Sequence, residues 1–110
     1  MGTEVEKTHN VPDQREPWVE RTVKIRNRQG LHGRPTTLFV TTAQRFESEI
    51  LVSWDGSDEE VDGKSAISLL SLGAACGGAL RIRARGKDAQ EAVDTLVRLV
   101  ENGFQDEEEE

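Results

Sequence analysis

Hydrophobic and polar residues alternate along four segments of the chain, a pattern typical of β-strands with one face on a core and one in water. These segments are residues 22–26, residues 50–54, a short stretch near residues 59–61, and residues 79–85. In the last of them, apolar side chains are predicted to point inward and three arginines outward, namely Arg81, Arg83 and Arg85. We expect this outward row to be solvated rather than to bind RNA, because the strands place no aromatic side chain beside it for base stacking.

Three further segments carry apolar residues three or four positions apart, which predicts helices that each bury one face. The first spans residues 35–46, the second spans residues 65–72, and the third follows Asp88. In the second segment, Ile67 and Leu70 have helical spacing. In the third, Asp88 and Glu91 have the spacing of a capping box, and Gly103 is expected to end the helix.

The order of the predicted elements is β-α-β-β-α-β-α. Strands with one polar face belong in an antiparallel sheet that is covered on a single face. The three helices would form that cover. The pattern therefore predicts an α/β fold of two layers, an open-faced β-sandwich.

The net negative charge of the chain comes from its two ends. The 110 residues suit one domain and carry a formal charge of −7. Residues 1–20 hold two basic and five acidic groups, residues 105–110 hold five acidic groups, and residues 21–104 hold 12 basic and 11 acidic groups. We expect a flexible extension over residues 1–19, a nearly neutral domain over residues 20–104, and a disordered acidic tail over residues 105–110. Trp18 is expected to pack against the edge of the domain.

The composition disfavours several classes of protein. The acidic balance argues against a nucleic-acid binder, no apolar run approaches the roughly 20 residues that span a bilayer, and the first residues lack the apolar core of a secretory signal. The single cysteine, Cys76, cannot form an internal disulfide, and with His9 and His32 it makes a poor metal site. We expect a cytoplasmic protein that needs no metal or cofactor.

Residue types suited to chemistry gather between the first strand and the first helix. Pro35 fits a first helical turn, so the helix should begin at or just after His32, near the N-cap. A helix N-terminus attracts anions and disfavours an imidazolium, so the ring would keep a nucleophilic nitrogen. Arg34 adds a donor fork for phosphate oxygens, and Gly33 lets the backbone approach a bulky anion. These features indicate a histidine that accepts a phosphoryl group; the alternative is one that only caps the helix.

The motif Gly30-Leu31-His32-x-Arg34-Pro35 resembles the active-centre signature of HPr, the histidine-containing phosphocarrier family of the phosphoenolpyruvate-dependent sugar phosphotransferase system. The likeness covers about residues 20–104 and continues through Ala43-x-x-Phe46, Gly63-Lys64-Ser65, Ser71-Leu72-Gly73 and Gly86-x-Asp88-Ala89. It implies an open-faced β-sandwich with strand order 1-4-2-3. The sequence departs from the family at Gly33, where alanine or threonine is more common, and in a longer hairpin between residues 54 and 61.

The resemblance implies that His32 is phosphorylated on Nδ1 by enzyme I and passes the group to a sugar-specific or regulatory enzyme IIA acceptor. Arg34 would stabilise the phosphoryl group, and Gly33, Pro35 and Leu69 would be binding residues. For Leu69, the alternative is packing against the last helix. Such a protein is a phosphoryl carrier rather than a free-standing enzyme, and it is expected to be a monomer between transient complexes.

Ser65 matches a serine that an HPr kinase/phosphorylase modifies in part of the family. Independently of the resemblance, Ser65 opens a predicted helix, where a hydroxyl commonly serves as an N-cap. A phosphate there would suit the helix dipole and present about two negative charges to a partner. The alternative function is therefore a regulatory interaction protein controlled through Ser65, with little or no role in sugar transport.

Overall fold

The structure is a computed structural model, and it describes residues 16–28, 30–73 and 77–104. Its seven elements follow the predicted order β-α-β-β-α-β-α. In chain order they are β1 (Val19–Lys24), α1 (Arg34–Ala43), β2 (Glu49–Trp54), β3 (Val61–Asp62), α2 (Ala66–Leu72), β4 (Ala79–Arg85) and α3 (Ala89–Glu101).

Some predictions concern residues outside the described ranges. These are the extension over residues 1–15, the acidic tail over residues 105–110, His9 and Cys76. Within the described ranges, no helix is long and apolar enough to cross a membrane. In the same part of the chain, no three His, Cys, Asp or Glu side chains are grouped so that they could hold a metal ion.

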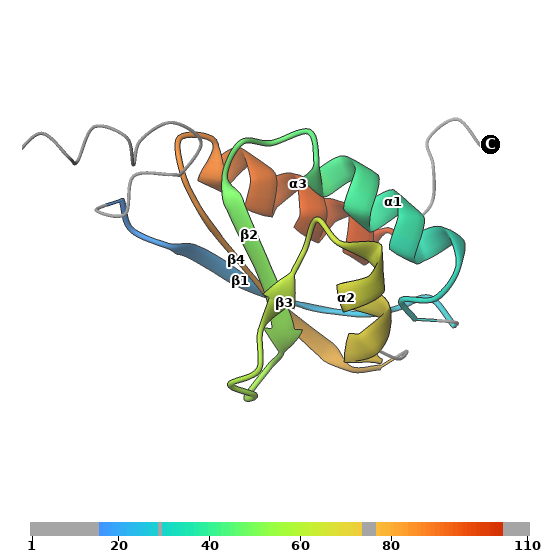
Figure 1. The fold of residues 1–110 in the computed structure, drawn as a ribbon. Coiled ribbons are helices and arrows are strands. Elements are labelled where there is room, and N and C mark those ends of the chain that lie inside the picture. The colour runs from blue at the N-terminus through green and yellow to red at the C-terminus, as the bar shows by residue number, and fades with distance from the viewer. Residues whose placement is uncertain (1–15, 29, 74–76, 105–110) are drawn as a thin grey trace, which may run out of the picture.

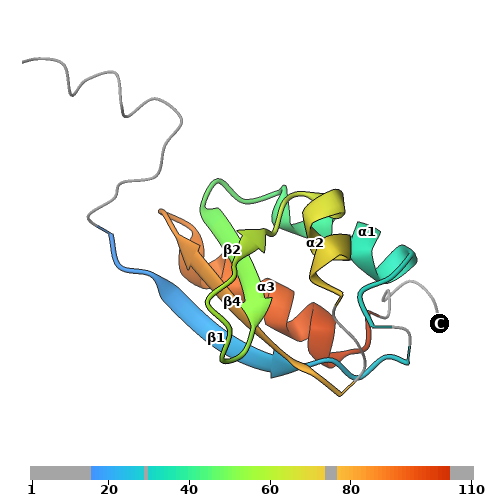
Figure 2. The same ribbon diagram turned by 60° about the horizontal axis from the view of Figure 1, so that its bottom comes forward.

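The four strands form one sheet in the order β1-β4-β2-β3, and each neighbouring pair is antiparallel (Figure 1). β4 is central: Leu80 lies opposite Val23 of β1, and Ile82 lies opposite Val52 of β2. The three helices cover one face of the sheet (Figures 1 and 2). The predicted two-layer, open-faced β-sandwich with strand order 1-4-2-3 is therefore confirmed.

The core lies between the sheet and the helices. The inward residues of β4, Leu80, Ile82 and Ala84, are fully buried, as the alternation predicts. α3 contributes the largest helical stripe, which consists of Ala89, Ala92, Val93, Leu96, Val97 and Val100. Burial of each valine or leucine in this stripe stabilises the fold by about 1.5–3 kcal/mol, so this interface supplies much of the folding free energy.

The bounds of several elements differ from the predictions. β1 starts at Val19 rather than at residue 22, because its pairing with β4 extends over six residues whose side chains are mostly exposed. Ile25 is buried as predicted but lies beyond the end of β1. α1 ends at Ala43, and Phe46 enters the core from the turn that follows. β3 occupies residues 61–62 rather than 59–61.

Asp88 precedes α3, but it does not cap that helix as the sequence predicts. Its carboxylate accepts hydrogen bonds from the backbone N–H groups of Glu47 at 2.9 Å and Ser48 at 3.0 Å, and from the Ser48 hydroxyl. Burial raises the pKa of Asp88, but these hydrogen bonds outweigh it and hold that pKa below its ordinary value of 3.8. The side chain therefore fastens the start of α3 to the turn before β2.

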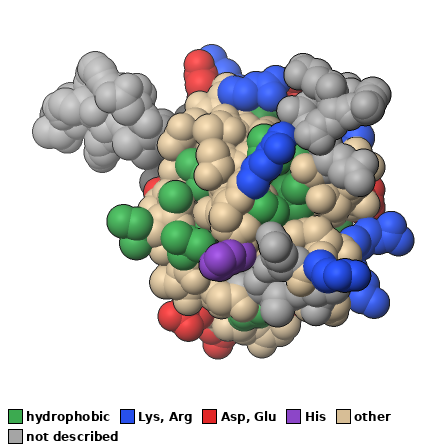
Figure 3. All heavy atoms as spheres, turned by 90° about the vertical axis from the view of Figure 1, so that its right-hand side faces the viewer, with side chains coloured by type: hydrophobic (Ala, Val, Ile, Leu, Met, Phe, Trp, Pro, Cys, Tyr) green, Lys and Arg blue, Asp and Glu red, His purple; other side chains and the backbone are tan. Residues whose placement is uncertain are grey.

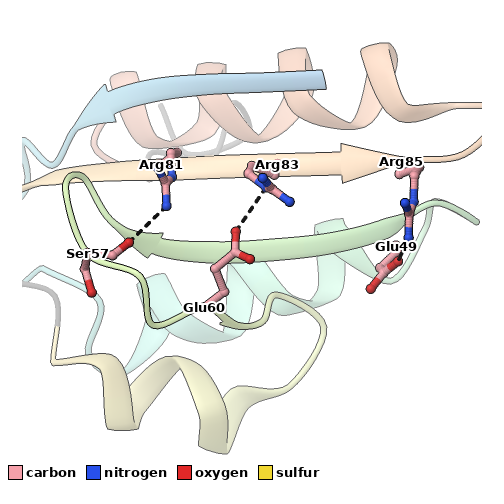
Figure 4. Close-up of polar contacts among 6 residues, drawn as sticks. All are labelled: Glu49, Ser57, Glu60, Arg81, Arg83 and Arg85. Carbon is pink, nitrogen blue, oxygen red and sulfur yellow. Dashed lines mark hydrogen bonds and ion pairs between the residues drawn. The ribbon is translucent and has the colours of Figure 1, made fainter. Parts of the chain in front are cut away.

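The outward arginine row of β4 is half-buried, so the prediction of a solvated row is wrong. Residues 47–62 contain seven acidic and no basic residues, and this hairpin lies next to β4. Figure 4 shows the hydrogen bonds and ion pairs between the three arginines and this hairpin. The contacts are Arg81 Nη2 to Ser57 O at 3.0 Å, Arg83 Nε to Glu60 Oε2 at 3.0 Å, and Arg85 Nη2 to Glu49 Oε1 at 3.4 Å.

The start of β1 and the end of α3 lie in different places relative to the loop that leads into α1. β1 begins at the end of the sheet away from the loop that leads into α1 (Figure 1). α3 ends on the side of the domain where α1 begins (Figures 1 and 2). The β1–α1 loop and the end of α3 therefore share one side of the molecule.

Candidate functional site

The loop between β1 and α1 carries His32 and is anchored before it. Backbone hydrogen bonds tie Ile25, at the start of the loop, to the residues that precede β4. Asn27 Nδ2 donates to the carbonyl of Gly30 at 2.8 Å, and the N–H of Gly30 donates to the carbonyl of Asn27 at 3.1 Å. Leu31 is buried in the core. His32 therefore follows directly on a residue whose position is fixed by packing.

The exposed side chain of His32 lies immediately before the first turn of α1. Gly33 is the N-cap, and its carbonyl accepts hydrogen bonds from the N–H groups of Thr36 and Thr37. Pro35 lies in the first turn, as predicted. The expectation that His32 lies near the N-cap is confirmed, and the positive end of the helix dipole is beside it.

His32, Gly33 and Arg34 form one exposed stretch of chain. Gly33 has φ +67° and ψ −129°, a backbone conformation that residues with a side chain rarely adopt. No atom lies within 4 Å of the place that a Cβ would occupy. The backbone conformation therefore favours glycine here, whereas the sequence prediction attributed Gly33 to room for an anion.

The predicted docking role of Leu69 is wrong, because Leu69 is 0% exposed and belongs to the core. The large hydrophobic residues of α2 that are exposed are Ile67, at 79%, and Leu70, at 48%. Their helical spacing correctly predicts a helix, but both residues lie on its outer face rather than on the buried face. Figure 3 shows hydrophobic side chains on one side of the histidine and basic side chains on others. An apolar surface therefore adjoins His32. In α2, the large apolar side chains that are exposed are Ile67 and Leu70 rather than Leu69.

Ser65 is the N-cap of α2, as its place at the start of the predicted helix indicated. Its Oγ accepts a hydrogen bond from the N–H of Ser68 at 3.2 Å. The preceding loop is held to the end of α1, because Lys64 Nζ donates to the carbonyl of Phe46 at 2.7 Å and Gln44 Nε2 donates to the carbonyl of Lys64 at 3.1 Å. Sequence reasoning missed Lys64 and Gln44, since neither pattern nor spacing indicates a contact between these loops.

The segment of the chain that contains the loop is basic. Residues 21–46, which contain the loop and α1, include six basic residues and no acidic residue. The acidic hairpin that follows in the chain is paired with β4 instead, and Arg21 pairs with Asp94 at 3.3 Å. The charges of residues 21–104 nearly cancel when they are summed, so the sum conceals this basic segment.

Comparisons with known proteins identify the family. The family profile "PTS HPr component phosphorylation site" matches residues 19–102. The HPr-like protein Crh of Halalkalibacterium halodurans is 39% identical over 83 residues, which cover 76% of this chain and 96% of that protein. The phosphocarrier protein HPr of Treponema pallidum is 36% identical over 89 residues, which cover 81% of this chain and 99% of that protein.

A solved structure shows the same relationship in three dimensions. HPr-C-His from Thermoanaerobacter tengcongensis is 42% identical and superimposes with a TM-score of 0.74, covering 78% of this chain and 94% of that one. The profile match, the identity to these relatives and the open-faced sandwich agree with one another. The chain belongs to the HPr phosphocarrier family of the phosphotransferase system.

Proposed function

We propose that this protein carries a phosphoryl group on His32 from enzyme I to an enzyme IIA acceptor, either sugar-specific or regulatory. The observation that supports this most directly is the exposed His32, presented by an anchored loop one residue before the N-cap of α1. In a member of the HPr family, a ring in this position is accessible to a large donor and then to a large acceptor. The protein itself acts as a carrier rather than as a free-standing enzyme.

The transfer needs few groups on the carrier. The lone pair on Nδ1 of a neutral His32 attacks the phosphorus of phosphorylated enzyme I. A P–N bond forms as the bond from phosphorus to enzyme I breaks, and its electron pair returns to the donor atom. Arg34 and the positive end of α1 stabilise the charge on the phosphoryl oxygens. Positioning and charge stabilisation dominate such reactions, and Gly33 and Pro35 contribute by shaping the first turn.

The surface around His32 suits transient docking. Ile67 and Leu70 supply an exposed apolar patch, and residues 21–46 supply cations without acidic neighbours in sequence. Enzyme I and enzyme IIA would dock through faces that combine apolar contacts with carboxylates. Opposite charge speeds the encounter more than it strengthens the complex, which suits a relay that must release each partner.

The test is intact-mass analysis after incubation with phosphoenolpyruvate and enzyme I. We expect a gain of one phosphate, which acid removes because a P–N bond is acid-labile. His32→Ala should prevent the gain. The matched control is His9→Ala, which removes the other histidine of the chain and should leave the gain intact. A phosphate that persists in His32→Ala would refute the assignment.

A second function, regulation through Ser65, is supported by the place of this residue. Ser65 is partly exposed and lies two residues before the exposed Ile67. A phosphate on Ser65 would replace a hydroxyl cap with a dianion at the start of α2, next to the proposed docking patch. An HPr kinase/phosphorylase would be the modifying partner. Partner binding would then respond to Ser65 even where sugar transport is not involved.

This function is tested with an HPr kinase, ATP and the same mass analysis. We expect an acid-stable phosphate that Ser65→Ala abolishes and His32→Ala does not. A pull-down comparing Ser65→Asp with Ser65→Ala should then recover different partners. Identical partners from both variants would count against a regulatory role.

A further inference from the structure

Trp18 makes a contact that the family match does not include, since that match begins at residue 19. The carbon at the centre of the Arg83 guanidinium lies 4.2 Å from the centroid of the Trp18 ring, and that of Arg85 lies 4.3 Å away. Both distances are well inside the roughly 6 Å range of a cation–π interaction. Trp18 is partly buried although it precedes the first strand. It therefore packs on the outward face of β4, whereas the sequence predicted packing at the domain edge.

The two arginines are held in place by other contacts. Arg83 is paired with Glu60 and Arg85 with Glu49, so both guanidinium groups are fixed from the side of the β2–β3 hairpin. A group that is already ordered loses little conformational freedom when a second contact forms. The ring of Trp18 therefore lies on cations that the fold has already positioned.

The strand that follows Trp18 lies at the edge of the sheet and buries little apolar surface of its own. Among the described residues, β1 is an edge strand that pairs with β4 alone. Val23 is its one fully buried side chain, Val19 is partly buried against the core, and Arg21 pairs with Asp94 of α3. Edge strands with little buried surface open more readily than central ones. β1 also leads directly into the loop that carries His32, so opening of β1 would loosen the start of that loop.

We propose that Trp18, Arg83 and Arg85 form a latch that fastens the beginning of β1 to the sheet. The latch compensates for the small apolar area that β1 buries, and it links the segment before β1 to the acidic hairpin through the ion pairs of the two arginines. It makes residues 16–18 part of the folded unit. This inference does not depend on the proposed phosphoryl transfer.

The test is amide hydrogen exchange of the full chain, followed residue by residue with NMR. Trp18→Ala should speed exchange in β1 on the order of ten-fold, the effect of losing two partly exposed cation–π contacts. Exchange in β2 should stay within about two-fold of the unsubstituted protein, because β2 is held on both sides by β4 and β3. Equal acceleration in both strands, or none in either, would overturn the proposal.

Two conservative variants distinguish the cation–π contribution of the Trp18 ring from the burial of apolar surface alone. Trp18→Leu keeps an apolar side chain but has no π-system, so β1 should exchange nearly as fast as in Trp18→Ala. Trp18→Phe keeps an aromatic face and should retain part of the protection. If Trp18→Leu protects β1 as well as tryptophan does, the arginines are not the basis of the latch.

Discussion

Asp88 joins two parts of the fold, so its replacement has an effect that can be worked out from its contacts. Alanine at this position removes three hydrogen bonds, two of which come from Ser48, a residue that is 0% exposed. A buried donor without an acceptor costs about 1–3 kcal/mol, whereas the N–H of the exposed Glu47 can turn to water. We expect Asp88→Ala to lower the free energy of unfolding by about 2–4 kcal/mol, a large part of the roughly 5–15 kcal/mol of an ordinary domain.

The same contacts predict a dependence on pH. The folded pKa of Asp88 is below 3.8, so its ionised form contributes stability above that pH and the contribution is lost as the pH falls through the folded value. Asp88→Asn is neutral at every pH and keeps one oxygen that can accept from Ser48. The gap in stability between the unsubstituted protein and Asp88→Asn should therefore be constant near neutral pH and narrow in acid.

Urea unfolding at a series of pH values measures both effects. Other carboxylates titrate equally in the two proteins, so their contributions cancel in the comparison. If Asp88→Ala changes the free energy of unfolding by less than about 0.5 kcal/mol, the hydrogen bonds do not hold α3 to the turn before β2. If the difference in stability between the unsubstituted protein and Asp88→Asn stays the same in acid, the hydrogen-bond donors do not stabilise the charged form of Asp88 in particular.

Three further predictions concern the loop and α2. Gly33→Ala should cost about 1–3 kcal/mol in urea unfolding through backbone strain alone, and an unchanged midpoint would show that the loop relaxes. Leu69→Ala should cost about 2–5 kcal/mol, whereas Ile67→Ala, on the outer face of the same helix, should stay within about 0.5 kcal/mol; equal losses would contradict the burial pattern. Arg34→Lys should slow phosphorylation of His32 by enzyme I on the order of ten-fold or more, because lysine lacks the planar fork; an equal rate would show that a single positive charge suffices.

Much of the fold was predictable because two segments carry strong periodic patterns. β4 matches its predicted bounds of residues 79–85, and the buried stripe of α3 matches its predicted apolar face. Alternation and helical spacing record which side chains are buried, so they succeed where one face of an element is wholly apolar. β1 was placed less well, because Glu20, Arg21 and Thr22 are polar on both faces and their pairing with β4 makes them part of a strand.

The site was predictable where covalent neighbours decide the geometry and unpredictable where contacts between distant segments decide it. Pro35 fixes the beginning of a helix locally, so the position of His32 followed from the sequence. The burial of Leu69 and the exposure of Leu70 depend on how α2 is rotated against the sheet. In the same way, no local pattern in the sequence predicts that Arg83 contacts both Glu60 and Trp18.

The start of β1 and the loop that carries His32 lie at opposite ends of the sheet, and this separation has a practical consequence. A linker attached ahead of Glu16 would depart from the domain at a point remote from His32. A protein immobilised on a bead through this linker would keep the histidine accessible to donor and acceptor. A linker attached after Phe104 would leave from the side where α1 begins. In a fusion to a second domain, the choice of end would therefore decide whether the neighbour is a passive anchor or a competitor for access to the loop.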